Sequence, residues 1–407
     1  MTSQDTGFLP HDDLIEAINL LQPSVLASLS LDNLPEHYPE QGLGESATLN
    51  LLAPHILGNA ARLDDPLALA HMDPPTPWIT WATALWNARL NQNLLHPATA
   101  PFAIAAEKKV VNWLIPYFGM EGGHFCSGST LANLTALWAA RDAKQVKKIV
   151  ASGAAHLSIQ KSAQILGLPF ETLPTNDQGQ MVLEVPIDLS NACLVLTAGT
   201  TATGAIDPLD LIGQAAWTHV DAAWAGSLRL SPTYADRLDG IEQADSIAIS
   251  VHKWFFQPKE SALVLFRDLE LANSAISFGG GYLTEPNIGV QGSRGAAAVS
   301  LLATLIAWGQ TGLVERIDWT MAIAQTLSDF ILAEPGLDQL AAPTTGINVF
   351  RPTRITTDTL LQCLPEGLFS TCVLGDNVWL RSVAANPLAD INAIIDVLQQ
   401  ALKCKEY

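Results

Sequence analysis

The middle of the chain alternates between two hydrophobic patterns. Between about residues 120 and 270, short runs rich in Val, Ile and Leu are bounded by turn residues and separated by stretches of helical periodicity. The strand candidates are ACLVLTAG (192–199), WTHVDAAW (217–224), DSIAISVH (245–252) and SALVLFRD (261–268). Strands that alternate with helices predict an α/β fold, in which a mostly parallel central sheet carries helices on both faces.

The flanking regions follow other patterns. Residues 1–60 are typical of amphipathic helices joined by turns, and a long helical segment begins near residue 292. Beyond residue 335 the pattern predicts a strand, a hairpin that turns at Gly375-Asp376-Asn377, and a closing helix, which together form a small α+β domain. We therefore expect an N-terminal helical segment (1–60), a large domain (61–315) and a small C-terminal domain (316–407).

Composition narrows the class of protein. The chain has 407 residues, of which 48% are hydrophobic and 15% charged, so it is long enough for a large core and is not disordered in composition. Its formal charge of −19, from 40 acidic and 21 basic residues, argues against nucleic-acid and anionic-membrane partners. No window holds about eighteen uninterrupted apolar residues, so no membrane partner is expected.

Cysteine and histidine usage point to the cytoplasm and away from metal sites. The five cysteines are scattered without a C-x-x-C pair, which favours reduced thiols. The first residues are acidic and polar and lack the regions of a signal peptide, so we expect a cytoplasmic protein. The nine histidines show no metal-ligand spacing, so no metal is expected.

Lys253 is the first candidate for chemistry. It follows the apolar strand candidate in DSIAISVHKW, where a strand ends in the interior. Lysines more often cover apolar surface with their stems while the ammonium reaches water. An interior lysine is also a nucleophile, because burial lowers its pKa.

Three further stretches carry suitable groups. Ser127–Thr130 precede a helix, whose N-terminus can bind phosphate, although such residues are also ordinary helix caps. Asp221 ends an apolar strand, where a carboxylate needs a cationic partner or caps the next helix. His156 stands just before an amphipathic helix, where a cap or a core histidine is the simpler interpretation. A phosphate cradle, an interior carboxylate and an interior lysine are together what pyridoxal 5′-phosphate requires.

The motifs GSTLANL, GTTATGAIDP, HVDAAWAG and DSIAISVHKW occur in an order that resembles the pyridoxal-phosphate-dependent group II amino-acid decarboxylases. The resemblance extends from about residue 90 to about residue 398. It implies a fold-type I enzyme, similar in fold to aspartate aminotransferase, which removes the α-carboxylate of an L-amino acid. It also implies a homodimer with active sites at the interface.

The resemblance assigns the cofactor contacts. Lys253 would form the Schiff base with pyridoxal 5′-phosphate, and Asp221 would pair with the pyridine nitrogen. Ala223 would pack under the ring and His156 on its opposite face. The resemblance further implies that the phosphate is bound by Ser129, Thr130, His252 and Ser250. It also implies that Thr201, or Thr197 in its place, contacts the phenolic oxygen or the substrate carboxylate.

The resemblance also assigns two groups on the substrate side. Thr76 in DPPTPW would contact the substrate, and Tyr282 would donate the proton to Cα, with His156 or a water as the alternative donor. The sequence departs from the family pattern at Leu131, where Glu is usual, and at Ser250-Val251, where Asp or Asn followed by Pro is usual.

Alternatives to a decarboxylase remain open at this point. An aminotransferase, an aldolase or another lyase of the same fold would use the same lysine and aspartate, and the departures above leave room for a non-catalytic binding protein. The sequence does not identify the amino acid, although LNQNLLHPATAP is most similar to diaminobutyrate and aspartate decarboxylases.

Overall fold

The computed structural model describes residues 39–183 and 187–403 together with residues 15, 18, 19, 21 and 34–37. The chain forms two compact units, residues 1–62 and residues 63–407. In the first unit, helix α2 (Glu45–Asn59) lies in the predicted helical segment, and the rest of that prediction lies mostly outside the described residues. Everything below concerns the second unit.

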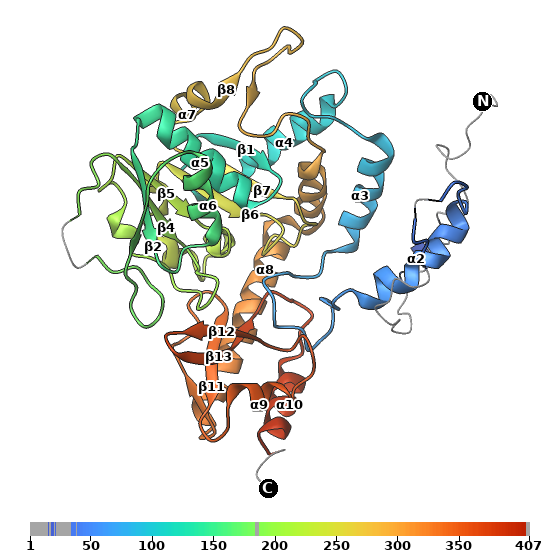
Figure 1. Ribbon diagram of the computed structural model, residues 1–407, viewed down its shortest axis with the longest axis vertical. Coiled ribbons are helices and arrows are strands. Elements are labelled where there is room, and N and C mark those ends of the chain that lie inside the picture. Colours follow the sequence, from blue (N-terminus) through green and yellow to red (C-terminus); the bar gives the residue numbers. More distant parts are fainter. Residues whose placement is uncertain are drawn as a thin grey trace. The chain divides into compact units, whose positions relative to one another are not determined.

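A seven-stranded sheet forms the centre of the second unit (Figure 1). Its order is β1-β7-β6-β5-β4-β2-β3, and only β7 runs against the others. The strands are β1 (Gly122–Cys126), β2 (Lys148–Ser152), β3 (Phe170–Leu173), β4 (Ala192–Thr197), β5 (Trp217–Asp221), β6 (Ser246–Ser250) and β7 (Ala262–Phe266). The predicted mostly parallel sheet and its four strand candidates are confirmed.

Both faces of this sheet are covered by helices. Alternate residues of one strand belong to different cores: Leu194 and Leu196 face one layer, whereas Cys193 and Val195 face the other. This is why the strands read as continuous apolar runs. The helices of this unit are α3 (Trp78–Leu90), α4 (Pro101–Leu114), α5 (Ser129–Lys144), α6 (Leu157–Ile165), α7 (Leu269–Ile276), α8 (Ala297–Ala333), α9 (Thr357–Leu361) and α10 (Ile391–Lys403).

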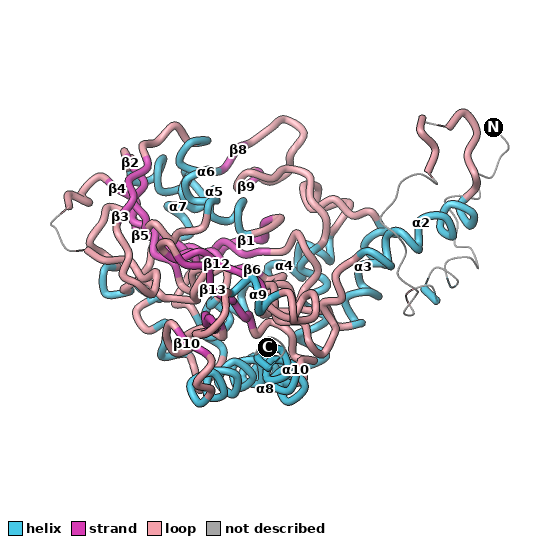
Figure 2. Tube along the Cα trace, turned by 60° about the horizontal axis from the view of Figure 1, so that its bottom comes forward, coloured by secondary structure: helices cyan, strands magenta, loops and turns pink. Residues whose placement is uncertain are grey.

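A smaller antiparallel sheet follows α8 and confirms the predicted C-terminal α+β domain. Its order is β10-β11-β13-β12, and α10 lies beside α8 (Figure 2). The strands are β10 (Leu337–Gln339), β11 (Ile347–Pro352), β12 (Ser370–Leu374) and β13 (Asn377–Val383), and a separate pair is formed by β8 (Ser277–Phe278) and β9 (Asn287–Ile288). The predicted domain boundaries stay predictions, and the one near residue 315 falls inside α8.

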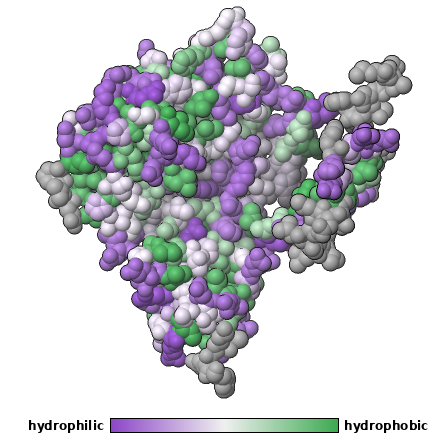
Figure 3. Space-filling view, in the orientation of Figure 1, coloured by the Kyte–Doolittle hydropathy of each residue, from purple (hydrophilic) through white to green (hydrophobic). Residues whose placement is uncertain are grey.

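Helix α8 is, among the described residues, the one helix long and apolar enough to cross a membrane by length and composition. This is weak evidence, because a core helix of a globular protein meets the same test. Leu301, Leu313 and Ile317 of α8 are buried in the core of the large sheet. The face of the molecule in Figure 3 mixes hydrophilic and hydrophobic side chains.

Gly123 tests the packing of the central sheet. An added Cβ there would lie 2.0 Å from the carbonyl oxygen of Val264 on the paired strand β7. We expect Gly123→Ala to destabilise the fold by at least about 2 kcal/mol, because backbone atoms must move. Gly279→Ala is the matched control, since a Cβ at Gly279 meets nothing within 4 Å. Thermal unfolding of both variants gives the measurement, and equal melting temperatures would contradict the pairing of β1 with β7.

Candidate active site

The carboxyl ends of the parallel strands meet at one edge of the sheet and form a cavity of about 240 Å³. Strands β4, β5 and β6 end there at Thr197, Asp221 and Ser250. Ligands of such sheets bind beyond this edge. The cavity brings together most of the predicted site residues, namely Ser129, Thr130, His156, Thr201, Asp221, Ala223, His252 and Lys253.

Lys253 lies in the turn that follows β6 and faces the cavity. Burial lowers the pKa of its ammonium, while the negative charges of Asp221 and Asp73 act in the opposite direction. Its side chain makes no hydrogen bond or ion pair to any residue that the structure describes. The amine is therefore both easier to deprotonate than an exposed lysine and free to react.

Asp221 is almost completely buried, with 3% of its surface exposed. Oδ1 accepts a hydrogen bond from the Ala223 amide at 3.1 Å, and Oδ2 accepts one from Nδ2 of Asn133 at 3.0 Å. These donors stabilise the carboxylate where water cannot. The carboxylate still faces the cavity, so it can meet a cationic group there.

The start of α5 supplies hydroxyl and backbone donors. Gly128 has a φ of +102°, a conformation that favours glycine, and it leads directly into Ser129. Ser127 is fixed by the amide of Gln291, which accepts from the Ser127 backbone at 2.7 Å and donates to its Oγ at 2.6 Å. The combination of hydroxyls with a helix N-terminus is suited to a phosphate.

His252 is held by a backbone carbonyl. Its Nδ1 lies 2.9 Å from the oxygen of Ser261, so this nitrogen carries the proton, and Nε2 lies 3.1 Å from Oγ of Ser250. Burial and the charges of Lys259 and Lys253 lower the pKa of His252 to about 4. Ser250 itself does not line the cavity but orients the ring that does. A bound anion would favour the protonated ring, which would then donate from Nε2.

His156 precedes α6 and caps it. Its Nδ1 accepts from the Ser158 amide at 3.2 Å and lies 2.8 Å from the Ser158 hydroxyl. Burial lowers the pKa of His156. Both the cap interpretation and the position at the cavity are therefore correct for this residue, and its role toward a cofactor stays a prediction.

Two tryptophans attach the cavity to the small domain. Trp224 and Trp254 stack with ring centroids 4.1 Å apart. Their Nε1 atoms donate to the carbonyl oxygens of Thr345 and Ala384, at 2.7 and 3.2 Å. Because Trp254 follows Lys253 in the chain, packing of the small domain fixes the turn that carries the lysine.

Two predicted residues lie outside this cavity. Thr76 accepts a hydrogen bond from Nε1 of Trp81 at 3.0 Å and does not line it. Tyr282 is 74% exposed, and its nearest described ring is His96, with centroids 6.3 Å apart. The roles predicted for both residues stay predictions.

Sequence reasoning missed the residues that support the cavity from behind. Asn133 and Ser158 connect Asp221 to His156, His219 contacts Oδ1 of Asn133, and Gln291 orients Ser127. A signal was present for one of them, since His219 is two residues before Asp221 in a strand and so shares its face. Within residues 39–183 and 187–403, no cluster of three His, Cys, Asp or Glu side chains could hold a metal.

The sequence matches a family model. Residues 30–351 match the pyridoxal-dependent decarboxylase conserved domain. The L-2,4-diaminobutyrate decarboxylase of Acinetobacter baumannii is 28% identical over 89% of this chain and 84% of its own length. The aspartate 1-decarboxylase of Aliivibrio fischeri is 28% identical over 80% of this chain and 71% of its own length.

A solved structure also matches. The glutamate decarboxylase domain of diaminobutyrate-pyruvate transaminase and L-2,4-diaminobutyrate decarboxylase from Vibrio parahaemolyticus superimposes with a TM-score of 0.76. It is 25% identical, and the match covers 97% of this chain and 90% of that one. The similarity extends through the small domain, so the predicted fold-type I architecture is confirmed.

Proposed function

Since the chain belongs to the pyridoxal-dependent decarboxylase family, we propose that its substrate is L-2,4-diaminobutyrate. The chain is a pyridoxal-phosphate-dependent amino-acid decarboxylase, and the other reaction classes are not favoured. In the reaction, the bond from Cα to the carboxylate breaks, CO2 leaves, and a proton is added at Cα to give the amine. The match to a diaminobutyrate decarboxylase over 89% of this chain carries the choice of substrate.

The cavity fits the cofactor on its own chemistry. The amine of Lys253 has no partner among the described residues, as is needed for a bond to the cofactor aldehyde. The carboxylate of Asp221 is buried, as is needed for a contact with the protonated ring nitrogen. Oγ1 of Thr197 is buried at the cavity with no hydrogen-bond partner among the described residues. Such an orphaned hydroxyl indicates a missing polar ligand.

The residues of this chain divide the work. Lys253 would hold the cofactor through its aldehyde, and Asp221 would accept a hydrogen bond from the protonated ring nitrogen. Ser129, Thr130 and His252 hold the phosphate. The bound cofactor supplies an electron sink for the electrons that remain on Cα when CO2 leaves.

Asp73 supports a substrate with a second ammonium group. It follows Met72, which lines the cavity, and its negative charge acts on Lys253. Asp73 forms an ion pair with Lys259, and 39% of its side chain is exposed. With Asp221 committed to the cofactor, Asp73 is the carboxylate we propose for the γ-ammonium of the substrate.

A substrate screen tests this proposal. We expect CO2 release and amine formation from L-2,4-diaminobutyrate at a kcat/KM about 10-fold or more above that for L-aspartate, because Asp73 would attract the side-chain ammonium and repel a side-chain carboxylate. The screen also includes L-glutamate, cysteine sulfinate and the aromatic amino acids. A higher kcat/KM for any of these would overturn the assignment while leaving the reaction class intact.

The same screen with Asp73→Asn tests the recognition residue. The variant should raise KM for L-2,4-diaminobutyrate by roughly 3- to 10-fold, the range of a partly exposed charged contact, and leave kcat unchanged. Asp338→Asn is the matched control, because Asp338 pairs with Arg351 at similar exposure in the small domain. An unchanged KM in Asp73→Asn would exclude this residue from substrate binding.

A homodimer with shared active sites is the second part of the proposal. Helix α3 exposes Trp78, Trp81 and Trp86, which are costly to leave in water and typical of an interface. Tyr282 is exposed and does not line the cavity of its own chain. We propose that a second copy of the chain covers α3 and receives Tyr282, which donates the proton to Cα.

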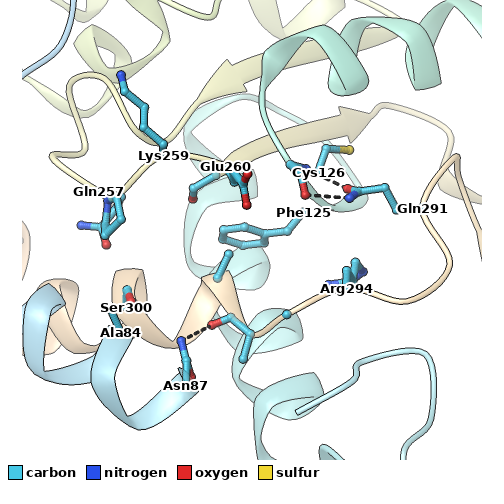
Figure 4. Close-up of a pocket in the computed structure, with 16 residues that line it drawn as sticks. Ala84, Asn87, Phe125, Cys126, Gln257, Lys259, Glu260, Gln291, Arg294 and Ser300 are labelled. Carbon is cyan, nitrogen blue, oxygen red and sulfur yellow. Dashed lines mark hydrogen bonds between the residues drawn. The ribbon is translucent and has the colours of Figure 1, made fainter. Parts of the chain in front are cut away.

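A second cavity beside the cofactor cavity supports this arrangement. It has a volume of about 260 Å³, shares Ser127 with the first, and lies between α3, the start of α8 and the loop after Lys253 (Figure 4). The ring of Phe125 lies between Gln257 and Arg294 in this view. Gln257 Oε1 and Ser261 Oγ are buried there without a partner among the described residues. A side chain of the second copy would satisfy them.

Mixed dimers test the exchange of Tyr282. Lys253→Ala and Tyr282→Phe should each be nearly inactive, since general acid catalysis supplies about 10²–10⁴-fold. After unfolding and refolding together in equal amounts, half of the dimers are hybrids, and each hybrid has one intact site if Tyr282 acts on the partner. The mixture should then recover about a quarter of the wild-type activity. Lack of recovery would place both residues in the site of one chain, and a fully active Tyr282→Phe would exclude Tyr282 from catalysis.

A further inference from the structure

Buried polar side chains form a continuous chain of hydrogen bonds behind the cofactor cavity, which we call the relay. Asn133, Ser158, His219 and Ser246 are fully buried. The contacts, in order, are Trp217 Nε1 to Ser246 Oγ (2.8 Å), Ser246 Oγ to His219 Nδ1 (2.9 Å), His219 Nε2 to Asn133 Oδ1 (3.0 Å), Asn133 Nδ2 to both Asp221 Oδ2 and Ser158 Oγ (3.0 Å each), and Ser158 Oγ to His156 Nδ1 (2.8 Å).

One end of the relay is consistent with a single direction. The indole nitrogen of Trp217 can only donate, so Ser246 accepts from it and keeps its own proton free for donation to Nδ1 of His219. A neutral His219 then carries its proton on Nε2 and donates to Oδ1 of Asn133. The ring is neutral because burial lowers the pKa of His219 to about 4. The amide nitrogen of Asn133 is thereby turned toward the cavity.

The other end independently requires the same direction. The carboxylate of Asp221 only accepts, so Asn133 must present its NH₂ group to Oδ2. The second hydrogen of that group is donated to Ser158, whose hydroxyl proton then goes to Nδ1 of His156. Because Nδ1 of His156 is an acceptor, its proton is on Nε2. A flipped Asn133 amide would place an oxygen against the carboxylate.

We propose that Asn133 is a positioning residue that sets both sides of the cofactor at once. One amide hydrogen holds the carboxylate of Asp221, and the other holds Ser158 so that its hydroxyl joins its backbone amide as a second donor to Nδ1 of His156. Nε2–H of His156 is then the group available to the cavity. His219 keeps the amide in this orientation. This inference rests on the proposed decarboxylase site, in which Asp221 and His156 contact opposite faces or edges of the cofactor.

Substitution of Asn133 by aspartate replaces an amide that donates two hydrogens by a carboxyl group that donates at most one, at nearly constant shape. In the holoenzyme, Asn133→Asp should weaken cofactor binding and lower kcat by roughly 10- to 100-fold each, the range of a hydrogen bond to a charged group. Asn348→Asp is the matched control, since Asn348 is equally buried in the small domain and bonds only to Ala324 and Gln339. The control should lose melting temperature but keep kcat per bound cofactor and cofactor affinity.

Two substitutions of His219 test whether its donor and acceptor groups are what matters. His219→Gln offers one acceptor toward Ser246 and one donor toward Asn133, so it should stay within about 3-fold of the wild-type kcat. His219→Leu offers neither group and should approach the Asn133→Asp values. If His219 and Asn133 had a purely structural role, the loss of kcat across these variants would follow the loss of melting temperature and not the loss of hydrogen-bond donors.

Nitrogen-15 spectra of the histidine-labelled holoenzyme read the tautomer directly. We expect His156 with an unprotonated Nδ1 in the wild type and in His219→Gln, and in Asn133→Asp a shifted Nδ1 resonance that marks the loss of the Ser158 hydroxyl as its second donor. The proposal is overturned if Asn133→Asp keeps the wild-type Nδ1 resonance, or if it loses no more cofactor affinity than Asn348→Asp does. Neither readout needs the substrate, so both remain decisive if the screened amino acids are not decarboxylated.

Discussion

A carboxylate buried at the end of a strand is the constraint around which this site is organised. Asp221 sits at 3% exposure, where an uncompensated charge would cost several kcal/mol. The structure compensates it with the Ala223 amide, with Asn133 and with the positive charge of Lys253 across the cavity. These contacts stabilise the carboxylate in the folded protein and still allow it to accept a hydrogen bond from a protonated ring nitrogen in the cavity.

The lysine depends on a different part of the fold. Lys253 lies in a turn whose next residue, Trp254, is clamped between Trp224 and the small domain. Gly346 in that domain approaches so closely that a Cβ there would lie 2.9 Å from the Trp254 ring. The small domain therefore contributes to the site, because it holds in place the two loops that carry Lys253 and Ala223.

The sequence predicted the sheet and most of the cavity because local signals were strong. Apolar runs marked the strands β4 to β7, and Asp221 is the last residue of β5, while Lys253 lies in the turn after β6. The supporting residues left weaker signals, since Asn133 lies on a helix and His219 on a strand, and only folding brings them within 3.0 Å. Tyr282 is near the site residues in sequence, whereas in the structure it is 74% exposed and does not line the cavity.

Every role proposed for the cavity requires that Lys253 carries the cofactor. Reduction of the holoenzyme with borohydride, followed by protease digestion and mass spectrometry, locates the modified lysine. We expect one reduced pyridoxyl adduct per chain, on the peptide that contains Lys253, and its loss in Lys253→Ala even though that variant still binds the cofactor. An adduct on any other lysine, or none in a protein that decarboxylates amino acids, would exclude Lys253 from this role.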